Sequence, residues 1–448
     1  MTPEDHRRPQ SRRRITELPP ELQDLRLERA VLVGLSRGRD GANAEASLEE
    51  LRRLAATAGA ETVETVLHRR DRPDPATFIG KGKAQEVRDI VRGTGADTVI
   101  LDEELSPAQL RNLEEIFGCK VIDRTALIID IFAQHAHSSE GKAQVELAQL
   151  NYFLPRLRGW GESMSRLGGG IGTRGPGETK LEVDRRRIKR RIAKLLDEIE
   201  DLQKTRTTKR QDRARSYVPS VALVGYTNAG KSTLLNRLTN AGVPVEDKLF
   251  STLDPTTRRI ELPDGRPCVM TDTVGFVRKL PHALVEAFAS TLEEAVRADL
   301  ILHVVDGADQ DPEAQYAAVR EVLGEIGAAS VPELVAVNKI DALSEVALAR
   351  LHRRFGDAVF LSALGGEGVD IVLQRIAERL PHPEVEVSLL VPYDRGDVVA
   401  ALHAAGAVRH EEYTEAGTQL RARLRQDQLG RLERYLIPAE DKRRARRS

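Results

Sequence analysis

The sequence predicts an α/β protein whose central unit is built on a mostly parallel sheet. Short apolar runs alternate with amphipathic stretches through residues 26–140 and again through 218–380, a pattern typical of parallel sheets covered by helices. Between these regions, residues 141–205 repeat apolar residues at three- and four-residue intervals, which indicates an antiparallel helical hairpin. A small α+β unit is expected at 381–438.

The composition limits the class of protein. The chain has 448 residues, 31% of them charged, and a net charge of −1, so any affinity for nucleic acid must come from local basic patches. Its two cysteines, Cys119 and Cys268, cannot form a disulfide framework, which favours a reducing, cytoplasmic location. No apolar run is long enough to span a membrane. Residues 1–25 form a basic tail expected to be disordered, and 439–448 form a second basic tail.

The first unit, residues 26–140, alternates predicted strands with helices, which indicates a parallel sheet. The strands are expected at 30–35, 62–68, 98–103 and 120–123. The helices between them are expected at about 47–59, 82–95 and 106–118. Ser47 and Ser106 stand at the starts of two of these helices and are predicted to be N-caps.

Two features of this unit allow a second interpretation. FIGKGKAQEV at 78–87 places two Gly–Lys pairs before a helix and could hold a phosphate. A glycine turn with exposed lysines is favoured, because no G-x-x-x-x-G-K-S pattern forms. His135 and His137 have no third and fourth ligand nearby, so ordinary histidines are favoured over a metal site.

The predicted hairpin joins a helix at 142–157 to one that starts near residue 180, through a long glycine-rich loop at 156–177. Long loops without structure of their own are usually functional or disordered. The G-x-G-x-x-G match at 170–175 follows a helix and not a strand, which excludes a dinucleotide-binding turn. Arginines around a tryptophan suit contact with structured RNA, and a flexible linker is the alternative. The candidate RNA contacts are Arg156, Arg158, Trp160, Arg166 and Arg174.

Two further segments complete the organisation of the chain. Residues 206–217 are polar and basic, and we interpret them as a linker into the central unit. The unit at 381–438 combines predicted strands with helices and an antiparallel sheet, and it carries no recognisable chemistry.

The stretch VALVGYTNAGKST at 221–233 combines an apolar strand, a glycine turn and the start of a helix. The G-x-x-x-x-G-K-S spacing predicts a loop whose backbone N–H groups wrap the α- and β-phosphates of a nucleotide. Lys231 would add positive charge at the β- and γ-phosphates, and Ser232 would offer a hydroxyl to Mg²⁺. The candidate contacts are Gly225, Tyr226, Thr227, Asn228, Ala229, Gly230, Lys231, Ser232 and Thr233.

The stretch LFSTLDPTTR at 249–258 follows the phosphate loop by about twenty residues, where a guanine-nucleotide switch needs a threonine for Mg²⁺ and the γ-phosphate. Thr252 is the preferred ligand, and Thr256 or Thr257 is the alternative. The candidate contacts are Phe250, Ser251, Thr252, Leu253 and Asp254.

The stretch CVMTDTVGF at 268–276 is a predicted strand that ends in D-x-x-G. Asp272 can hold Mg²⁺ through water, and the Gly275 N–H can meet the γ-phosphate. The candidate contacts are Asp272, Thr273, Val274 and Gly275. Many GTPases place a water-orienting glutamine next, but this chain has Phe276. We therefore expect slow intrinsic hydrolysis that a partner accelerates.

The base would be recognised by NKID at 338–341, which follows an apolar run. Asp341 would accept hydrogen bonds from the guanine N1–H and exocyclic amine, a pair that adenine does not offer. The stretch SAL at 362–364 would supply a backbone N–H to guanine O6. The candidate contacts are Asn338, Lys339, Ile340, Asp341, Ser362, Ala363 and Leu364.

These motifs resemble the HflX-type GTPases of the translation-factor-related class. The resemblance rests on GTRGPGETKLEVDRRRI at 172–188, GYTNAGKSTLLNRL at 225–238, LFSTLDPTTRR at 249–259, DTVGFVRKLPHALVEAF at 272–288 and much of 78–150. It spans residues 26–380 and is specific, because other GTPases lack the GTRGPGE loop.

The resemblance implies a GTP-hydrolysing protein that associates with the large (50S) ribosomal subunit and its rRNA. The hairpin loop would reach toward the peptidyl-transferase region, and the protein would split or rescue stalled ribosomes. Mg²⁺ is the implied cofactor, hydrolysis is expected to be stimulated by the ribosome, and the protein is expected to be monomeric off it. ATP use is sometimes credited to the N-terminal region of this family, but we recognise no adenine-reading residues. A GTP-gated, RNA-binding assembly or regulatory factor without splitting activity is the alternative.

Overall fold

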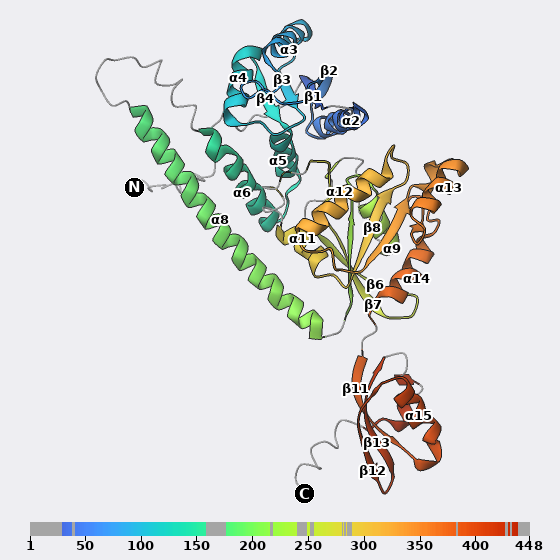
Figure 1. The fold of residues 1–448 in the computed structure, drawn as a ribbon. Helices are drawn as coiled ribbons and strands as arrows, with labels where there is room; N and C mark the ends of the chain where they lie inside the picture. The colour runs from blue at the N-terminus through green and yellow to red at the C-terminus, as the bar shows by residue number, and fades with distance from the viewer. Residues whose placement is uncertain are drawn as a thin grey trace, which may run out of the picture.

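A computed structural model describes residues 29–37, 41–157, 176–215, 218–239, 249–250, 255–279, 281, 284, 289–381, 384–425, 429–430 and 432–437. These residues form three sheet-containing units and a helical hairpin (Figure 1). The N-terminal unit lies at one end of the central unit, and the C-terminal unit lies at the opposite end. Within the described ranges, no helix is long and apolar enough to cross a membrane.

The N-terminal unit is a parallel sheet in the order β2-β1-β3-β4, as its alternating pattern predicted. Its strands are β1 (Arg29–Ser36), β2 (Glu61–Arg69), β3 (Thr98–Leu101) and β4 (Lys120–Asp123). Its helices are α2 (Gly41–Thr57), α3 (Lys81–Thr94), α4 (Pro107–Phe117) and α5 (Arg124–His135). Helices α2 and α5 share one apolar core with the sheet, and α3 and α4 share another. Both faces are therefore covered, which is why the central strands are apolar throughout.

Helix starts in this unit differ from the prediction in two places. Ser106 caps α4 in a capping box with Gln109, as expected. Ser47 is not a cap, because α2 begins at Gly41 and the Ser47 hydroxyl instead donates a 2.6 Å hydrogen bond to Asp102. Helix α5 was not anticipated. Asp123 caps it by accepting from the Ala126 N–H, and most of its length is buried.

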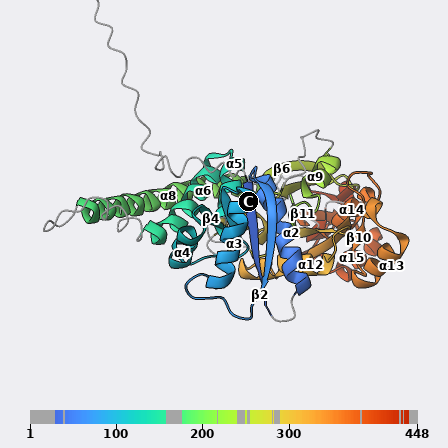
Figure 2. The ribbon, with the colours of Figure 1, turned by 90° about the horizontal axis from the view of Figure 1, so that it is seen from above.

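The hairpin consists of α6 (Ser139–Arg156) and α8 (Pro176–Arg215), which projects beyond the sheet units (Figure 2). The two helices pack through an apolar seam and through a bidentate pair of Arg191 with Glu146, both at 2.6 Å. The seam residues are Ala143, Leu147, Leu150, Leu195 and Ile199. Helix α8 continues to Arg215, so the stretch at 206–217 that we interpreted as a linker is mostly helical.

The central unit is a six-stranded sheet in the order β10-β9-β8-β5-β7-β6, parallel except for β6. Its strands are β5 (Ser220–Gly225), β6 (Thr256–Glu261), β7 (Pro267–Asp272), β8 (Leu300–Asp306), β9 (Glu333–Asn338) and β10 (Val359–Phe360). Its helices are α9 (Lys231–Thr239), α11 (Ala289–Val296), α12 (Pro312–Glu325), α13 (Glu345–Arg354) and α14 (Val369–Arg379), with a 3₁₀ turn η2 (Ile340–Ala342). Because the strands are parallel, their carboxyl ends gather the sequence motifs at one edge.

The C-terminal unit is an antiparallel sheet in the order β11-β13-β12 with one helix packed on it, as expected for a small α+β unit. Its elements are β11 (Glu384–Val391), η3 (Tyr393–Arg395), α15 (Gly396–Ala404), β12 (Val408–Thr414), β13 (Gly417–Arg425) and η4 (Glu433–Tyr435). Both basic tails lie outside the described residues.

The hairpin seam gives a test of the fold on two adjacent residues. Leu195 is fully buried between α6 and α8, whereas Leu196 is 52% exposed. Leu195→Ala should destabilise the hairpin by about 2–5 kcal/mol, because it removes buried methyl groups and leaves a cavity. Hydrogen exchange of the α6 and α8 amides should accelerate accordingly. Leu196→Ala is the control, and equal acceleration in both variants would contradict the packing.

Candidate nucleotide site

The phosphate loop connects β5 to α9, and its two glycines have backbone conformations that side chains disfavour. Gly225 has φ 152°, and a Cβ there would collide with the Val304 carbonyl of the neighbouring strand. Gly230 has φ 92°, and a Cβ there would collide with the Asn338 amide. The loop can therefore pass close to both neighbours only with glycine at these positions. Its backbone N–H groups lead into the N-terminus of α9, an arrangement that suits phosphate.

Lys231, the first residue of α9, is buried inside this loop. Its Nζ donates to the carbonyls of Gly225 at 3.0 Å and Tyr226 at 2.8 Å. Burial lowers the pKa of Lys231 to about 8, while the nearby Asp272 carboxylate opposes that shift. A phosphate group beside the ammonium would act like Asp272: its negative charge would favour the charged form of Lys231 and raise its pKa.

Ser232 and Asp272, two of the predicted Mg²⁺ ligands, meet across the sheet edge. The Ser232 hydroxyl donates a 2.6 Å hydrogen bond to Asp272 Oδ2, and Asp272 is 1% exposed. A hydroxyl and a carboxylate are oxygen ligands of the kind that Mg²⁺ prefers, so these residues fit the ion. Thr252, the third predicted ligand, lies outside the described residues with Ser251, Leu253 and Asp254. Thr257, an alternative ligand, lies on β6 with its hydroxyl 3.2 Å from that of Thr271.

The D-x-x-G segment lies directly against the phosphate loop. The Thr227 N–H donates to the Phe276 carbonyl at 2.7 Å, and the Phe276 N–H donates to the Gly225 carbonyl at 3.1 Å. Gly275 is held so close that a Cβ there would lie 2.7 Å from Thr227 Cγ2 and 3.1 Å from Lys231 Nζ. The side chain of Phe276 is 2% exposed and belongs to the apolar core of the central unit.

Asn338 connects the base-reading segment to the phosphate loop. Its Nδ2 donates to the Ala229 carbonyl, and its Oδ1 accepts from the Ala363 N–H, both at 2.8 Å. Asn338 is 2% exposed, so its loss would leave two buried backbone groups unpaired. Lys339 follows with φ 65° and pairs with Asp306 at 2.7 Å. Asp341 is exposed on η2, where its carboxylate is accessible to a base.

Two residues that support this segment were not singled out from the sequence. Arg237 on α9 donates to the carbonyls of Ala363 and Leu364 and so ties the second base loop to the phosphate-loop helix. Asp306 pairs with Lys339. Asp306 is an acid at the end of the apolar strand β8, and this position could have marked it in the sequence as a site residue. No sequence pattern marks Arg237.

Two of the remaining candidates, Ser362 and Leu364, differ in exposure. The Ser362 hydroxyl is buried and accepts from the Gly365 N–H at 2.9 Å, which shapes the loop. Leu364 is 76% exposed.

Taken together, these contacts place the phosphate-loop, D-x-x-G, NKID and SAL residues at one edge of the central sheet.

Arg156 does not fit the predicted contact with RNA. Its guanidinium donates to Asp123 at 3.3 Å and to the Leu105 carbonyl at 2.8 Å, and it stacks 3.5 Å from the centre of the Tyr152 ring. The side chain is 10% exposed. Arg156 therefore serves the contact between α6 and the N-terminal sheet. The other four candidates, Arg158, Trp160, Arg166 and Arg174, lie outside the described residues.

The other two open features of the N-terminal unit carry little chemistry. Gly80 has φ 86° at the start of α3, and Lys83 pairs with Glu86 at 2.7 Å, an arrangement that favours the glycine turn. His135 Nδ1 lies 2.8 Å from the Ile131 carbonyl. Among the described residues, no cluster of three or more His, Cys, Asp or Glu side chains could hold a metal ion.

Four family models match the chain in succession. They are GTP-binding GTPase N-terminal over residues 45–133, GTP-binding GTPase Middle Region over 135–213, 50S ribosome-binding GTPase over 220–339 and HflX C-terminal domain over 347–445.

Related proteins match over most of their length. GTPase HflX of Caldanaerobacter subterraneus subsp. tengcongensis is 47% identical over 410 residues, which cover 92% of this chain and 94% of the relative. GTPase HflX of Escherichia coli (strain K12) is 46% identical over 374 residues, which cover 83% and 88%. A solved structure of a GTP-binding protein from Sulfolobus solfataricus in complex with GDP aligns at 26% identity and a TM-score of 0.40, covering 79% of this chain and 98% of that one.

The base-reading assignment can be tested at Asp341. Asp341→Asn exchanges an acceptor for a donor, so it should weaken guanine nucleotides and shift the preference toward xanthosine nucleotides, whose base has a carbonyl in place of the amine. The shift should reach about tenfold or more in relative Kd, measured by competition with a fluorescent nucleotide. Asp370→Asn, which changes an exposed acid in the first turn of α14, is the matched control. An unchanged base preference in Asp341→Asn would contradict the assignment of Asp341 as the base-reading residue.

Proposed function

Because the chain belongs to the HflX family of GTPases, we propose that it acts as a GTP-driven factor on the large (50S) ribosomal subunit. In this proposal the residues gathered at the carboxyl edge of the central sheet bind GTP with Mg²⁺. The helical hairpin then carries the effect of the nucleotide to rRNA. The result would be the splitting or rescue of stalled ribosomes.

One observation supports the proposal above all: segments that border the nucleotide site pack into the core of the N-terminal unit. We call LFSTLDPTTR at 249–258 the first switch segment and residues 272–279 the second. Phe250 of the first segment contacts Phe132 of α5 edge to face with ring centres 4.6 Å apart. Val274 and Val277 of the second switch segment belong to the same apolar core, which also contains Ile128 of α5. A change in either switch segment therefore acts on α5.

Helix α5 leads directly into the hairpin. It ends at His135, α6 begins at Ser139, and the two helices pack on each other. Helix α8 packs along α6 and has 40 residues, a length of about 60 Å at 1.5 Å per residue. A rotation at α5 would therefore be passed through α6 to α8 and to the loop that joins these two helices. That loop carries Arg158, Trp160, Arg166 and Arg174, which we propose as the rRNA contacts.

For hydrolysis, the chain would position GTP more effectively than it would activate water. Lys231 would neutralise charge on the β- and γ-phosphates, and the Gly275 N–H would meet the γ-phosphate. Ser232, Asp272 and Thr252 would hold Mg²⁺, which supplies further positive charge at the phosphate oxygens. Phe276 is buried in the core and offers no group to orient water. Intrinsic turnover is therefore expected to be slow, and the ribosome would supply or order the missing group.

The splitting activity predicts a nucleotide dependence on sucrose gradients. Intact ribosomes incubated with the protein and GTP, or a non-hydrolysable analogue, should separate into subunits, and GDP should leave them intact. Joint substitution of Arg166 and Arg174 by Glu should abolish splitting because it reverses charge in the loop, whereas Arg353→Glu on the exposed end of α13 should not. If ribosomes stay intact in every nucleotide state while the protein still binds them, an RNA-binding assembly or regulatory factor is the better description.

The stimulation of hydrolysis gives a separate prediction. Single-turnover GTP hydrolysis should accelerate by at least about tenfold when purified large subunits are added, since roughly 1.4 kcal/mol of barrier suffices for that factor. Small subunits are the control. A rate that is already fast in the isolated protein and does not change with large subunits would contradict the role assigned to the ribosome.

A further inference from the structure

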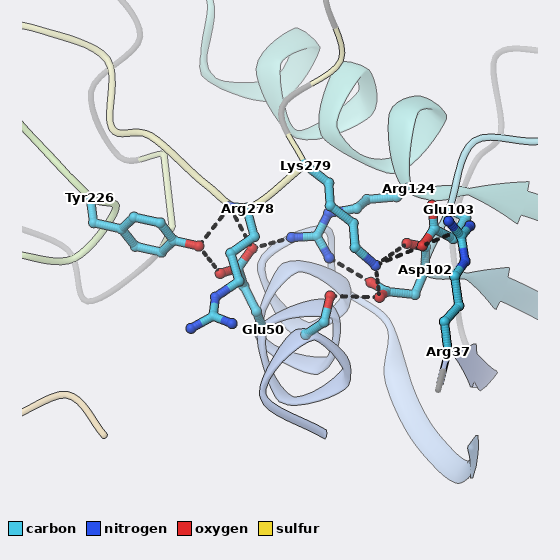
Figure 3. Close-up of polar contacts among 9 residues, drawn as sticks. Arg37, Glu50, Asp102, Glu103, Arg124, Tyr226, Arg278 and Lys279 are labelled. Atoms are coloured by element: carbon cyan, nitrogen blue, oxygen red, sulfur yellow. Dashed lines mark hydrogen bonds and ion pairs between the residues drawn. The ribbon is translucent and has the colours of Figure 1, made fainter. Parts of the chain in front are cut away.

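A cluster of polar side chains joins the N-terminal unit to the nucleotide site of the central unit (Figure 3). We call it the interdomain clamp and define it by Glu50, Asp102, Arg124, Tyr226, Arg278 and Lys279. Three of its members come from α2, the end of β3 and the start of α5 of the N-terminal unit. The other three come from the phosphate loop and from the segment after D-x-x-G.

Glu50 is the point at which the two units meet most directly. Its Oε2 accepts from the Tyr226 hydroxyl, and its Oε1 accepts from the Arg278 backbone N–H at 3.2 Å and from the Arg124 guanidinium. The Arg278 N–H also donates to the Tyr226 hydroxyl oxygen at 2.6 Å. A single carboxylate therefore binds one group in the phosphate loop and one group in the second switch segment.

The charges behind Glu50 keep it in place. Arg124 is 2% exposed and also donates to Asp102 at 2.5 Å, and Asp102 is 3% exposed. Asp102 accepts from Lys279 at 2.7 Å, and Glu103 pairs with Lys279 at 3.0 Å and with Arg37 at 3.8 Å. Three carboxylates thus face three cations. Arg124, Asp102 and Glu50 are the buried members, and removing one of the two acids would leave the buried guanidinium undercompensated, so this part of the arrangement is strongly held.

The clamp lies next to the two backbone hydrogen bonds between Thr227, Phe276 and Gly225. Tyr226 directly precedes Thr227, and Arg278 follows Phe276 by two residues. Because both clamp residues bind Glu50, the two chain segments are held together at this point. Gly275 consequently stays beside Lys231 and Thr227. A nucleoside diphosphate has no γ-phosphate to reach Gly275, whereas a triphosphate has one.

We propose that Glu50 is a positioning residue for the γ-phosphate. By holding the Tyr226 hydroxyl and the Arg278 N–H, it keeps Gly275 at the phosphate loop and so favours GTP over GDP. This role rests on the nucleotide site proposed above. Part of the discrimination between GTP and GDP would then depend on Glu50, which lies in the N-terminal unit, 176 positions from Tyr226 in sequence.

A purely structural role for the clamp predicts a different pattern. If Glu50 only held the two units together, its loss would weaken both nucleotides equally or lower the thermal stability alone. A positioning role affects only the nucleotide that contacts Gly275. The ratio of the two dissociation constants separates these explanations.

The test uses the full chain with Glu50→Gln, which keeps the shape of the side chain and removes its charge. The Kd for GDP and for a non-hydrolysable GTP analogue would be measured by titration of fluorescent nucleotides. We expect the Kd of the analogue to rise about tenfold, comparable to the loss of one charge-assisted hydrogen bond, while the Kd of GDP changes less than about twofold. Single-turnover GTP hydrolysis should slow in parallel.

Two further variants complete the test. Glu49→Gln changes the adjacent acid on α2, which pairs with Arg52 and Arg53 on the exposed face of that helix, and should leave the ratio at the wild-type value. Tyr226→Phe removes one hydroxyl and should reproduce the loss of discrimination even if Glu50→Gln fails to fold. An equal loss for both nucleotides, an unchanged ratio or faster hydrolysis would overturn the proposal. Failure of the wild-type protein to bind either nucleotide would instead refute the site itself.

Discussion

The buried guanidinium of Arg124, held between Glu50 and Asp102, is the constraint on which the arrangement of the two α/β units depends. A buried cation needs both acids, because leaving it uncompensated is strongly unfavourable. The same two acids also bind Tyr226, Arg278 and Lys279 of the central unit. The N-terminal unit therefore cannot move away from the nucleotide site without breaking the hydrogen bonds and the ion pair that Glu50 and Asp102 make with the central unit.

Apolar contacts extend this constraint to the rest of the switch region. Phe250, Val274 and Val277 are buried in a core whose other members lie mainly on α2, α5 and the first sheet. GTPase switches commonly rest on segments that are free to reorganise when the γ-phosphate is lost. Here those segments carry part of a second unit's core, so a rearrangement of either segment would also act on the N-terminal unit. The hairpin, which continues from α5 through α6, is the element that such a rearrangement would displace.

Much of the fold follows from local sequence, because apolar runs, helical periodicity and glycine turns act over a few residues. The parallel sheet of the N-terminal unit, the mostly parallel sheet of the central unit and the Ser106 cap were predictable in this way. The contacts between units were not, since Arg278 binds a carboxylate 228 positions away and no spacing rule reports such a pair. For the same reason the predictions of a cap at Ser47 and an RNA contact at Arg156 are wrong, because both side chains bind acids that are distant in sequence. Helix α5 shows no clear amphipathic pattern in the sequence, because its apolar residues run from Ala126 to Ala133 with only Asp130 between them.

We expect the nucleotide state to move the hairpin relative to the central unit through the clamp and α5. Spin labels at Lys194→Cys on α8 and Val346→Cys on α13 would report this distance, since both side chains are largely exposed and Cys268 is buried. Replacing Cys119 by Ser would leave the labels specific. Pulsed dipolar spectroscopy should give different distance distributions with GDP and with a non-hydrolysable GTP analogue, and the difference should shrink in Glu50→Gln. Distributions that coincide in the two nucleotide states of the wild-type protein would contradict the account.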